Sequence, residues 1–169
     1  MDQTMFSHPL PLTNVKVDDQ FWSEMMEKVR TKVIPYQWDA LNDRIEGAEP
    51  SYCIQNFKVA AGITLENKKQ ANEGVNTDNP NNSIKSGKFN GMVFQDSYAA
   101  KWLEAVAYSL EWHPDSELEK TADETIDLIC AAQQPDGYLD TYYIINGLDK
   151  RFTNLKDNHE LYCLGHFIE

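Results

Sequence analysis

Two apolar stripes of helical period, joined by a very short connection, constrain the fold of this chain most strongly. The stripes span residues 99–110 and 118–132. Apolar residues that recur every three or four positions give each helix one buried face. Only residues 112–115 separate the two, and Pro114 suits the first turn of the second helix. A link this short forces the helices to run antiparallel, which predicts a helical hairpin.

The flanking segments carry the same period, so the fold class that we expect is all-α. Asp18 and Asp19 can cap a first helix, and Pro35 is expected to kink or end it, because proline lacks an N–H and clashes with the preceding turn. A second helix is expected to open at Pro50, and Asn158 is expected to cap a last helix. The apolar face of the first helix comprises Phe21, Met25, Val29, Val33, Trp38, Leu41 and Ile45.

Other stretches depart from this pattern and suggest the domain organisation. Residues 1–17 are expected to form an extended lead-in to one helical domain over 18–169. A tract rich in Asn, Lys, Gly and Ser predicts a long polar loop at about 66–88. Residues 138–145 are rich in β-prone side chains, and we expect an extended loop or a single strand there. The last helical pattern runs to the final residue without a stop signal, which suggests a fragment.

Composition excludes several classes of function. Asp and Glu number 27 against 15 Lys and Arg, giving a net charge of −12 and a pI near 4.7. So acidic a chain lacks the basic footprint of a nucleic-acid binder or of a protein that binds anionic membranes. A neutral ligand such as a sugar remains compatible with this charge.

Cysteine usage and the N-terminal sequence suggest a cellular location. Cys53, Cys130 and Cys163 are far apart and form no C-x-x-C pair, which indicates reduced thiols in a cytoplasmic protein. The first residues lack a basic segment followed by an apolar core, so no secretory signal peptide is expected.

One group of potential metal ligands stands near the chain end. His159, Cys163 and His166 are spaced i, i+4, i+7, which places them on one helix face. They could bind zinc, but no fourth ligand is signalled, and the more economical interpretation is a face that packs or lines a pocket. Asp96 is interpreted first as a helix cap and Asp136 as a turn residue.

A combination of motifs leads further. Four stretches occur in a characteristic order, at 33–38, 56–62, 89–97 and 158–169, with two more between them at 101–105 and 132–141. Together they resemble the N-terminal part of glycoside hydrolase family 127, the β-L-arabinofuranosidases. The resemblance extends from about residue 14 to residue 169.

The resemblance implies a fold and a chemistry. The fold would be an (α/α)6 barrel, of which this chain supplies the first helices as a partial barrel. The reaction would be retaining hydrolysis of a terminal β-L-arabinofuranoside or another neutral glycoside. The implied nucleophile is a zinc-held Cys and the acid/base is a Glu, all downstream of the matched region. The resemblance therefore implies no catalytic and no metal-binding residue in this chain, zinc in the full-length protein, and a homodimer as one possible assembly.

The resemblance also implies candidates for sugar binding. His159 matches a family histidine that hydrogen-bonds a sugar hydroxyl, and imidazole offers one donor and one acceptor for this. Gln95 and Asp96 match a stretch near the barrel mouth and are further pocket candidates. The tract at 66–88 is longer than the loop that the family implies there.

Two alternatives stay open at this point. One is another six-hairpin enzyme, such as an unsaturated glucuronyl hydrolase, although its acidic sugar fits a chain of net charge −12 poorly. The other is a non-catalytic helical module for protein interaction or metal binding, built on His159, Cys163 and His166.

Overall fold

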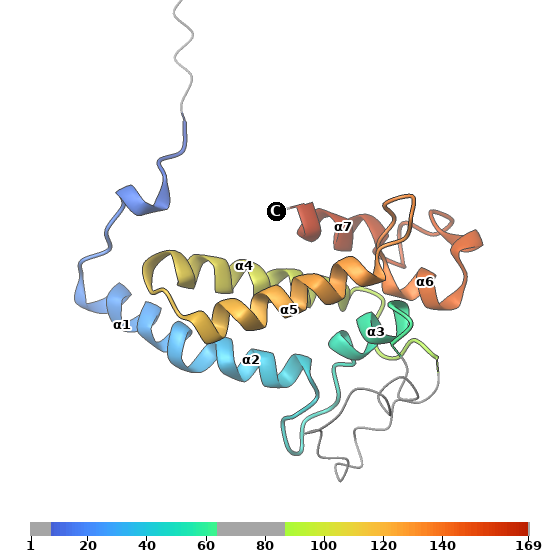
Figure 1. The fold of residues 1–169 in the computed structure, drawn as a ribbon, viewed down its shortest axis with the longest axis horizontal. Helices are drawn as coiled ribbons and strands as arrows, with labels where there is room; N and C mark the ends of the chain where they lie inside the picture. The colour runs from blue at the N-terminus through green and yellow to red at the C-terminus, as the bar shows by residue number, and fades with distance from the viewer. Residues whose placement is uncertain (1–7, 64–86, 169) are drawn as a thin grey trace, which may run out of the picture.

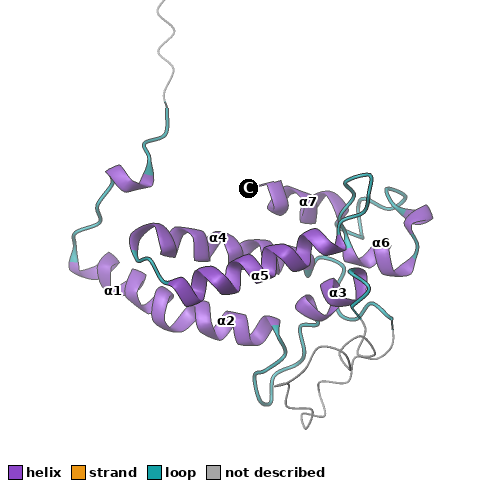
Figure 2. Cartoon of the chain, in the orientation of Figure 1, coloured by secondary structure: helices purple, strands orange, loops and turns teal. Residues whose placement is uncertain are grey.

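The computed structural model describes residues 8–63 and 87–168, and all regular elements within these ranges are helical (Figures 1 and 2). The all-α class is therefore confirmed. The α-helices are α1 (Gln20–Lys28), α2 (Ile34–Leu41), α3 (Cys53–Ala60), α4 (Asp96–Trp112), α5 (Ser116–Ala132), α6 (Thr141–Asn146) and α7 (Glu160–Ile168). The shorter turns are 3-10 helices at η1 (Leu12–Asn14) and η5 (Leu148–Lys150), and a π-helical turn at η2 (Val29–Val33).

The predicted hairpin is present as α4 and α5, which lie side by side and antiparallel in Figure 1. Asp115 is the N-cap of α5, and its carboxylate accepts hydrogen bonds from the backbone N–H groups of Glu117 and Leu118, both at 3.1 Å. These bonds satisfy two of the amides that a helix start leaves without partners. Pro114 precedes this cap, so the turn between the helices is short and well defined.

The hydrogen-bond pattern of the first helix changes just before Pro35. The helical chain passes from α1 into α2 through η2, and Pro35 occupies the first turn of α2. A π-helical turn shifts the hydrogen-bond ladder by one residue, which accommodates a residue that cannot donate. The predicted cap at Asp19 is confirmed, because its carboxylate accepts from the N–H of Trp22 at 2.7 Å. Helix α2 ends at Leu41, before Ile45.

The expected extended segment at 138–145 is wrong, since α6 occupies Thr141–Asn146. Asp140 caps this short helix by accepting from the N–H of Tyr143 at 3.1 Å. Local β-propensity is a weak preference, and a well-capped helix held by its neighbours overrides it.

Two other predicted segments, the lead-in and the polar loop, lie partly or almost entirely outside the described residues. Within the expected lead-in, the described part contains the 3-10 turn η1. The polar loop predicted at 66–88 falls almost entirely outside the described residues, which resume at Gly87.

The core is built around Trp102 of α4. Its side chain is 2% exposed, its indole stacks on Trp38 at 4.4 Å between ring centroids, and its Nε1–H donates to the carbonyl of Ile34 at 3.1 Å. The bond joins α4 to the first turn of α2, beside Pro35. The other buried apolar residues of this core are Ile34, Leu41, Cys53, Ile54, Phe57, Ala99, Val106, Ala122, Ile129 and Ala132.

The apolar face predicted for α1 is not buried. Phe21 is 63% exposed and Met25 and Val29 are each 39% exposed. An open apolar groove of about 330 Å³ runs between this face and α4, with Trp22 and Tyr108 among its walls. The helical spacing of the apolar residues predicted this helix correctly, but no element among the described residues covers its apolar face.

We expect Trp102→Phe to lower the free energy of unfolding by about 1–3 kcal/mol, because it removes the bond to Ile34 and leaves a small cavity. Urea denaturation followed by circular dichroism measures this. Trp22→Phe is the matched control, since Trp22 is exposed, and it should change stability by less than about 0.5 kcal/mol. Equal effects of the two substitutions would contradict the role of Trp102.

Candidate functional site

The candidate site lies where α4, α6 and α7 begin, and each start carries a buried acid. Asp96 is the first residue of α4, Asp140 caps α6, and Glu160 is the first residue of α7. All three are almost fully buried. Negative side chains are favoured at helix N-termini, where the backbone N–H groups carry partial positive charge.

Asp96 holds α6 against α4. Its two carboxylate oxygens accept hydrogen bonds from the N–H and from the hydroxyl of Thr141, both at 2.6 Å. Asp96 is only 2% exposed. The prediction that its side chain caps α4 is therefore wrong: the carboxylate binds a residue 45 positions along the chain. Sequence spacing gives no sign of this pairing.

Glu160 holds the loop before α7. One of its oxygens, Oε1, accepts from the hydroxyl of Tyr138 at 2.5 Å, and both oxygens accept from the N–H of Phe152 at 3.0 and 2.9 Å. In Asp140, Oδ1 accepts from Tyr143, whereas Oδ2 is buried without a hydrogen-bond partner among the described residues. A buried carboxylate oxygen without a donor strongly favours the protonated acid.

Burial accordingly changes the acidity of this cluster. It raises the pKa of Asp96 to about 6, against the lowering effect of the bonds from Thr141. It raises the pKa of Asp140 to about 7, and the negative charges of Asp96 and Glu160 add to the effect. Near neutral pH the cluster therefore retains protons that these side chains would lose in water.

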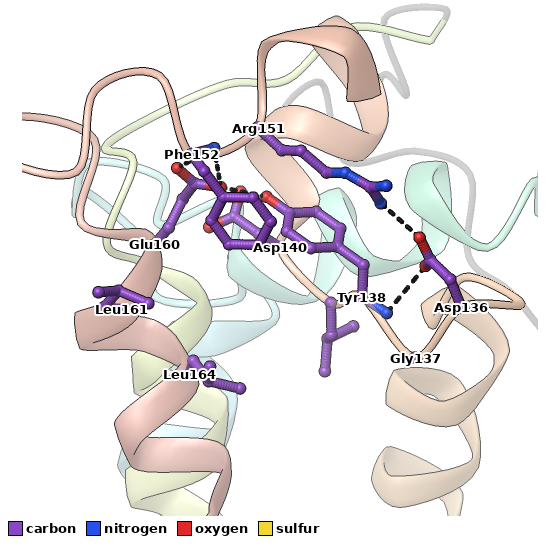
Figure 3. A pocket seen from close by; sticks show the side chains of 10 residues that line it. Asp136, Gly137, Tyr138, Asp140, Arg151, Phe152, Glu160, Leu161 and Leu164 are labelled. Atoms are coloured by element: carbon purple, nitrogen blue, oxygen red, sulfur yellow. Dashed lines mark hydrogen bonds and ion pairs between the residues drawn. The ribbon is translucent and has the colours of Figure 1, made fainter.

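A hollow of about 320 Å³ opens beside Glu160 (Figure 3). The ring of Tyr138 packs edge-on against Phe152 at 5.5 Å, and the Arg151 guanidinium lies over Tyr138 at 5.3 Å. Arg151 also pairs with Asp136 at 2.5 Å, and this bond lowers the pKa of Asp136. The remaining residues around the hollow are Gly137, Leu139, Asp140, Leu161 and Leu164.

Asp136 lies in the turn that was predicted for it. Its carboxylate accepts from the N–H of Tyr138 at 3.1 Å, and Gly137 has the positive φ of +87° that such a turn requires.

The loop before α4 is held from both sides by buried side chains. Asn56 of α3 donates to the carbonyl of Asn90 at 2.9 Å and accepts from its N–H at 3.2 Å. The thiol of Cys53 donates to the carbonyl of Gln95 at 3.1 Å, and that of Cys163 lies 3.8 Å from the carbonyl of Val93. The loop that carries Gln95 and leads into Asp96 is thus fixed to α3 and α7.

Gln95 turns back onto its own loop. Its Oε1 accepts from the N–H of Met92 at 2.8 Å, and a Cβ built on Gly91 would lie 2.0 Å from that oxygen. Gly91 also has a φ of +85°, which favours glycine, and a larger residue there would displace the Gln95 amide from its bond. Gln95 is 8% exposed, which leaves little of its side chain accessible.

His159 is the predicted site residue that the structure leaves accessible. It directly precedes α7 with a φ of +56°, and its ring lies near the rings of Phe94, at 5.5 Å, and Tyr162, at 5.9 Å. Its Nδ1 is 2.9 Å from the carbonyl of Asp157. A carbonyl oxygen can only accept, so Nδ1 is the donor in this bond, and in the matching tautomer Nε2 is an acceptor.

Asn158 does not cap α7 as predicted. Its amide instead donates to the hydroxyl of Tyr143 at 2.8 Å. The first backbone bond of α7 runs from the N–H of Cys163 to the carbonyl of His159 at 2.9 Å, so His159 stands at the cap position.

The two buried thiols among the described residues are not in the form that binds zinc, and the resemblance places the zinc centre downstream of this chain. Burial raises the pKa of the Cys53 thiol, and it raises that of Cys163 to about 12, so both remain protonated hydrogen-bond donors. Within residues 8–63 and 87–168, no three His, Cys, Asp or Glu side chains are grouped so that they could hold a metal ion. His159, Cys163 and His166 are therefore not brought together as metal ligands.

A helical domain with buried acids and an accessible histidine among aromatic rings is compatible with a carbohydrate-active enzyme. The family model for the GH127 catalytic domain of β-L-arabinofuranosidases matches residues 14–169. The chain belongs to this family. No helix in the described ranges has the length and apolar character needed to cross a membrane.

Relatives share this assignment. The non-reducing end β-L-arabinofuranosidase of Bifidobacterium longum subsp. longum is 40% identical over 172 residues, covering 92% of this chain and 23% of that protein. The crystal structure of Ara127N, a GH127 β-L-arabinofuranosidase from Geobacillus stearothermophilus T6, matches with a TM-score of 0.76 and 55% identity over 92% of this chain and 21% of that one. Another GH127 β-arabinofuranosidase matches with a TM-score of 0.70 and 28% identity, over 95% and 22% of the two chains.

These matches also show what share of its relatives' length the chain covers. It spans less than a quarter of the length of each of these relatives.

The acid cluster predicts a pH dependence of stability. Because folding raises the pKa of Asp96 to about 6 and of Asp140 to about 7, the folded chain binds more protons than the unfolded chain between about pH 4 and 7. The free energy of unfolding should therefore fall as pH rises through this window. Urea denaturation at pH values on either side of it measures the difference.

Asp140→Asn should reduce this pH dependence and make the chain more stable than the native one above the window. Asparagine can still accept the bond from Tyr143, so the cap of α6 is retained while the titrating group is lost. Asp123→Asn, at an exposed position of α5, is the control. The prediction fails if the Asp140 variant keeps the full pH dependence of the native chain.

Proposed function

We propose that this chain is the N-terminal part of a retaining exo-glycosidase that removes terminal β-L-arabinofuranosyl groups, and that it contributes part of the sugar subsite. The observation that carries the proposal is the geometry of His159 in a chain of the GH127 family. The ring lies beside Phe94 and Tyr162, and the bond to Asp157 uses Nδ1, which leaves Nε2 for another partner.

In this proposal His159 accepts a hydrogen bond from a sugar hydroxyl through Nε2. A neutral acceptor of fixed tautomer discriminates a hydroxyl donor from other groups, and it does so without burying a charge. Gln95 and Asp96 shape the subsite indirectly in this proposal. Gln95 fixes the loop after Gly91, and Asp96 fixes α6. The chemistry of bond cleavage falls to residues that this chain does not contribute.

Zinc and the nucleophilic Cys belong, in the same proposal, to the rest of the full-length protein. One observation supports this: the chain spans only 21% and 23% of two of the relatives above. A cytoplasmic location and assembly as a homodimer are part of the proposal as well. The three free thiols are what supports the location.

The family assignment does not favour the other two candidate functions. An unsaturated glucuronyl hydrolase would belong to another group of six-hairpin enzymes, whereas residues 14–169 match GH127. A metal-binding module would need His159, Cys163 and His166 to converge, and the Cys163 thiol is buried against Val93 instead.

Reading the encoding gene beyond codon 169 tests the proposal at the level of the whole protein. We expect an open frame that encodes a Cys-Cys pair and two candidate Glu residues. A stop codon directly after Glu169 would contradict the proposed enzyme.

A chimaera tests the role of His159. Replacing the matching segment of the Geobacillus enzyme by this chain should preserve arabinose release from an aryl β-L-arabinofuranoside. His159→Asn in that chimaera should lower kcat/KM about 10- to 100-fold, the effect of one lost hydrogen bond to substrate. Asparagine tolerates a positive φ, so the backbone is retained.

His113→Asn, at an exposed histidine between α4 and α5, is the matched control. A His159→Asn chimaera as active as this control would overturn the proposed sugar contact.

A further inference from the structure

His159 directly precedes α7 and has an unusual backbone conformation. Its φ of +56° places it in the left-handed region, which is unfavourable for a residue other than glycine. In the part of the chain that the structure describes, the ring bonds to the carbonyl of Asp157, two residues earlier, so this polar support is local. A ring that must meet a ligand in one orientation therefore needs support from its neighbours.

Tyr162 supplies one of the two aromatic neighbours, one helical turn further along α7. Its ring meets His159 at 5.9 Å and 89°, and it meets His166 at 4.8 Å and 82° on the other side. Three side chains of one helix face thus form a continuous edge-to-face stack. Tyr162 is 45% exposed, so packing alone does not fix its ring.

Lys101 of α4 fixes that ring from the opposite helix. Its ammonium donates to the Tyr162 hydroxyl at 2.7 Å and to the Ser97 hydroxyl at 3.2 Å, and it lies 4.9 Å from the centre of the Tyr162 ring. The same ammonium is 5.6 Å from the ring of Tyr98. The bond from Lys101 lowers the pKa of Tyr162, as expected when a cation donates to a phenol oxygen.

Lys101 is also linked through Ser97 to Phe94, whose ring lies near His159. Ser97 lies in the first turn of α4 and donates to the carbonyl of Phe94 at 2.7 Å. The Phe94 ring is the second aromatic neighbour of His159. Lys101 therefore contacts the Tyr162 ring directly and is linked through Ser97 to the backbone carbonyl of Phe94.

We propose that Lys101 and Tyr162 are positioning residues for His159, holding its ring so that Nε2 points to the sugar subsite. The proposal rests on the proposed sugar-binding function of His159, and it adds two residues that motif spacing does not connect. Lys101 and Tyr162 act through His159 and need not touch the sugar themselves.

The experiment uses the 169-residue chain with histidine labelled with ¹⁵N in the ring, and it reads the ring signals by long-range ¹H–¹⁵N NMR without any sugar present. His159 is assigned by the signal that His159→Asn removes. In the native chain the two ring nitrogens should give widely separated signals, as for a single Nδ1–H tautomer. Tyr162→Phe and Lys101→Met should bring these signals closer together, because the released ring samples both tautomers.

Conservative and distant substitutions provide the controls. Lys101→Arg keeps a donor and a cation and should restore most of the native separation. Tyr108→Phe removes a hydroxyl from an exposed tyrosine of α4, and Lys120→Met removes an exposed lysine of α5. Neither should move the His159 signals. Circular dichroism verifies that each variant keeps its helices.

If the His159 signals are unchanged in folded Tyr162→Phe and Lys101→Met, the proposal is overturned. Titration with L-arabinose is the second measurement, and both variants should bind it about tenfold more weakly than the native chain. Absence of arabinose binding by the native chain would count against the proposed function alone, since the ring signals decide the positioning role without sugar.

Discussion

The carboxylate of Asp96, buried against Thr141, is the contact on which the rest of the site depends. A helix as short as α6 is not stable alone, because the conformational entropy lost in nucleating a helix exceeds the free energy that the hydrogen bonds of one turn provide. Asp96 supplies the two hydrogen bonds that fix its first residue. Helix α6 then places Tyr143, whose hydroxyl accepts the bond from Asn158 beside His159. A contact inside the molecule thereby determines where the accessible imidazole stands.

The same contact shows what could and could not be read from the sequence. The hairpin of α4 and α5, the cap at Asp19 and the turn at Asp136 rest on interactions between residues close in the chain, and each was predicted. Helix α6 was missed because its stability comes from a partner 45 residues away, which local propensity does not register. The face of α1 was misjudged because period shows which residues are apolar but not what covers them.

The candidate site was also predictable from the sequence only in part. Resemblance pointed to His159, Gln95 and Asp96, and the structure places them around one junction of helices with very different exposure. The positive φ of His159 and the bond from Lys101 to Tyr162 had no signal in the sequence, because both depend on how α4 packs against α7. Asp96 was predicted at the start of a helix, but its pairing with Thr141 was not, and the positions of Asp140 and Glu160 at two further helix starts were not predicted.

The bonds between Asn56 and Asn90 have a consequence for the loop before α4. They tie Asn90 to α3, 34 positions earlier in the chain. The loop of Gly91 and Gln95 thus takes part of its position from a different helix. A substitution at Asn56 would therefore act on this loop although Asn56 lies outside it.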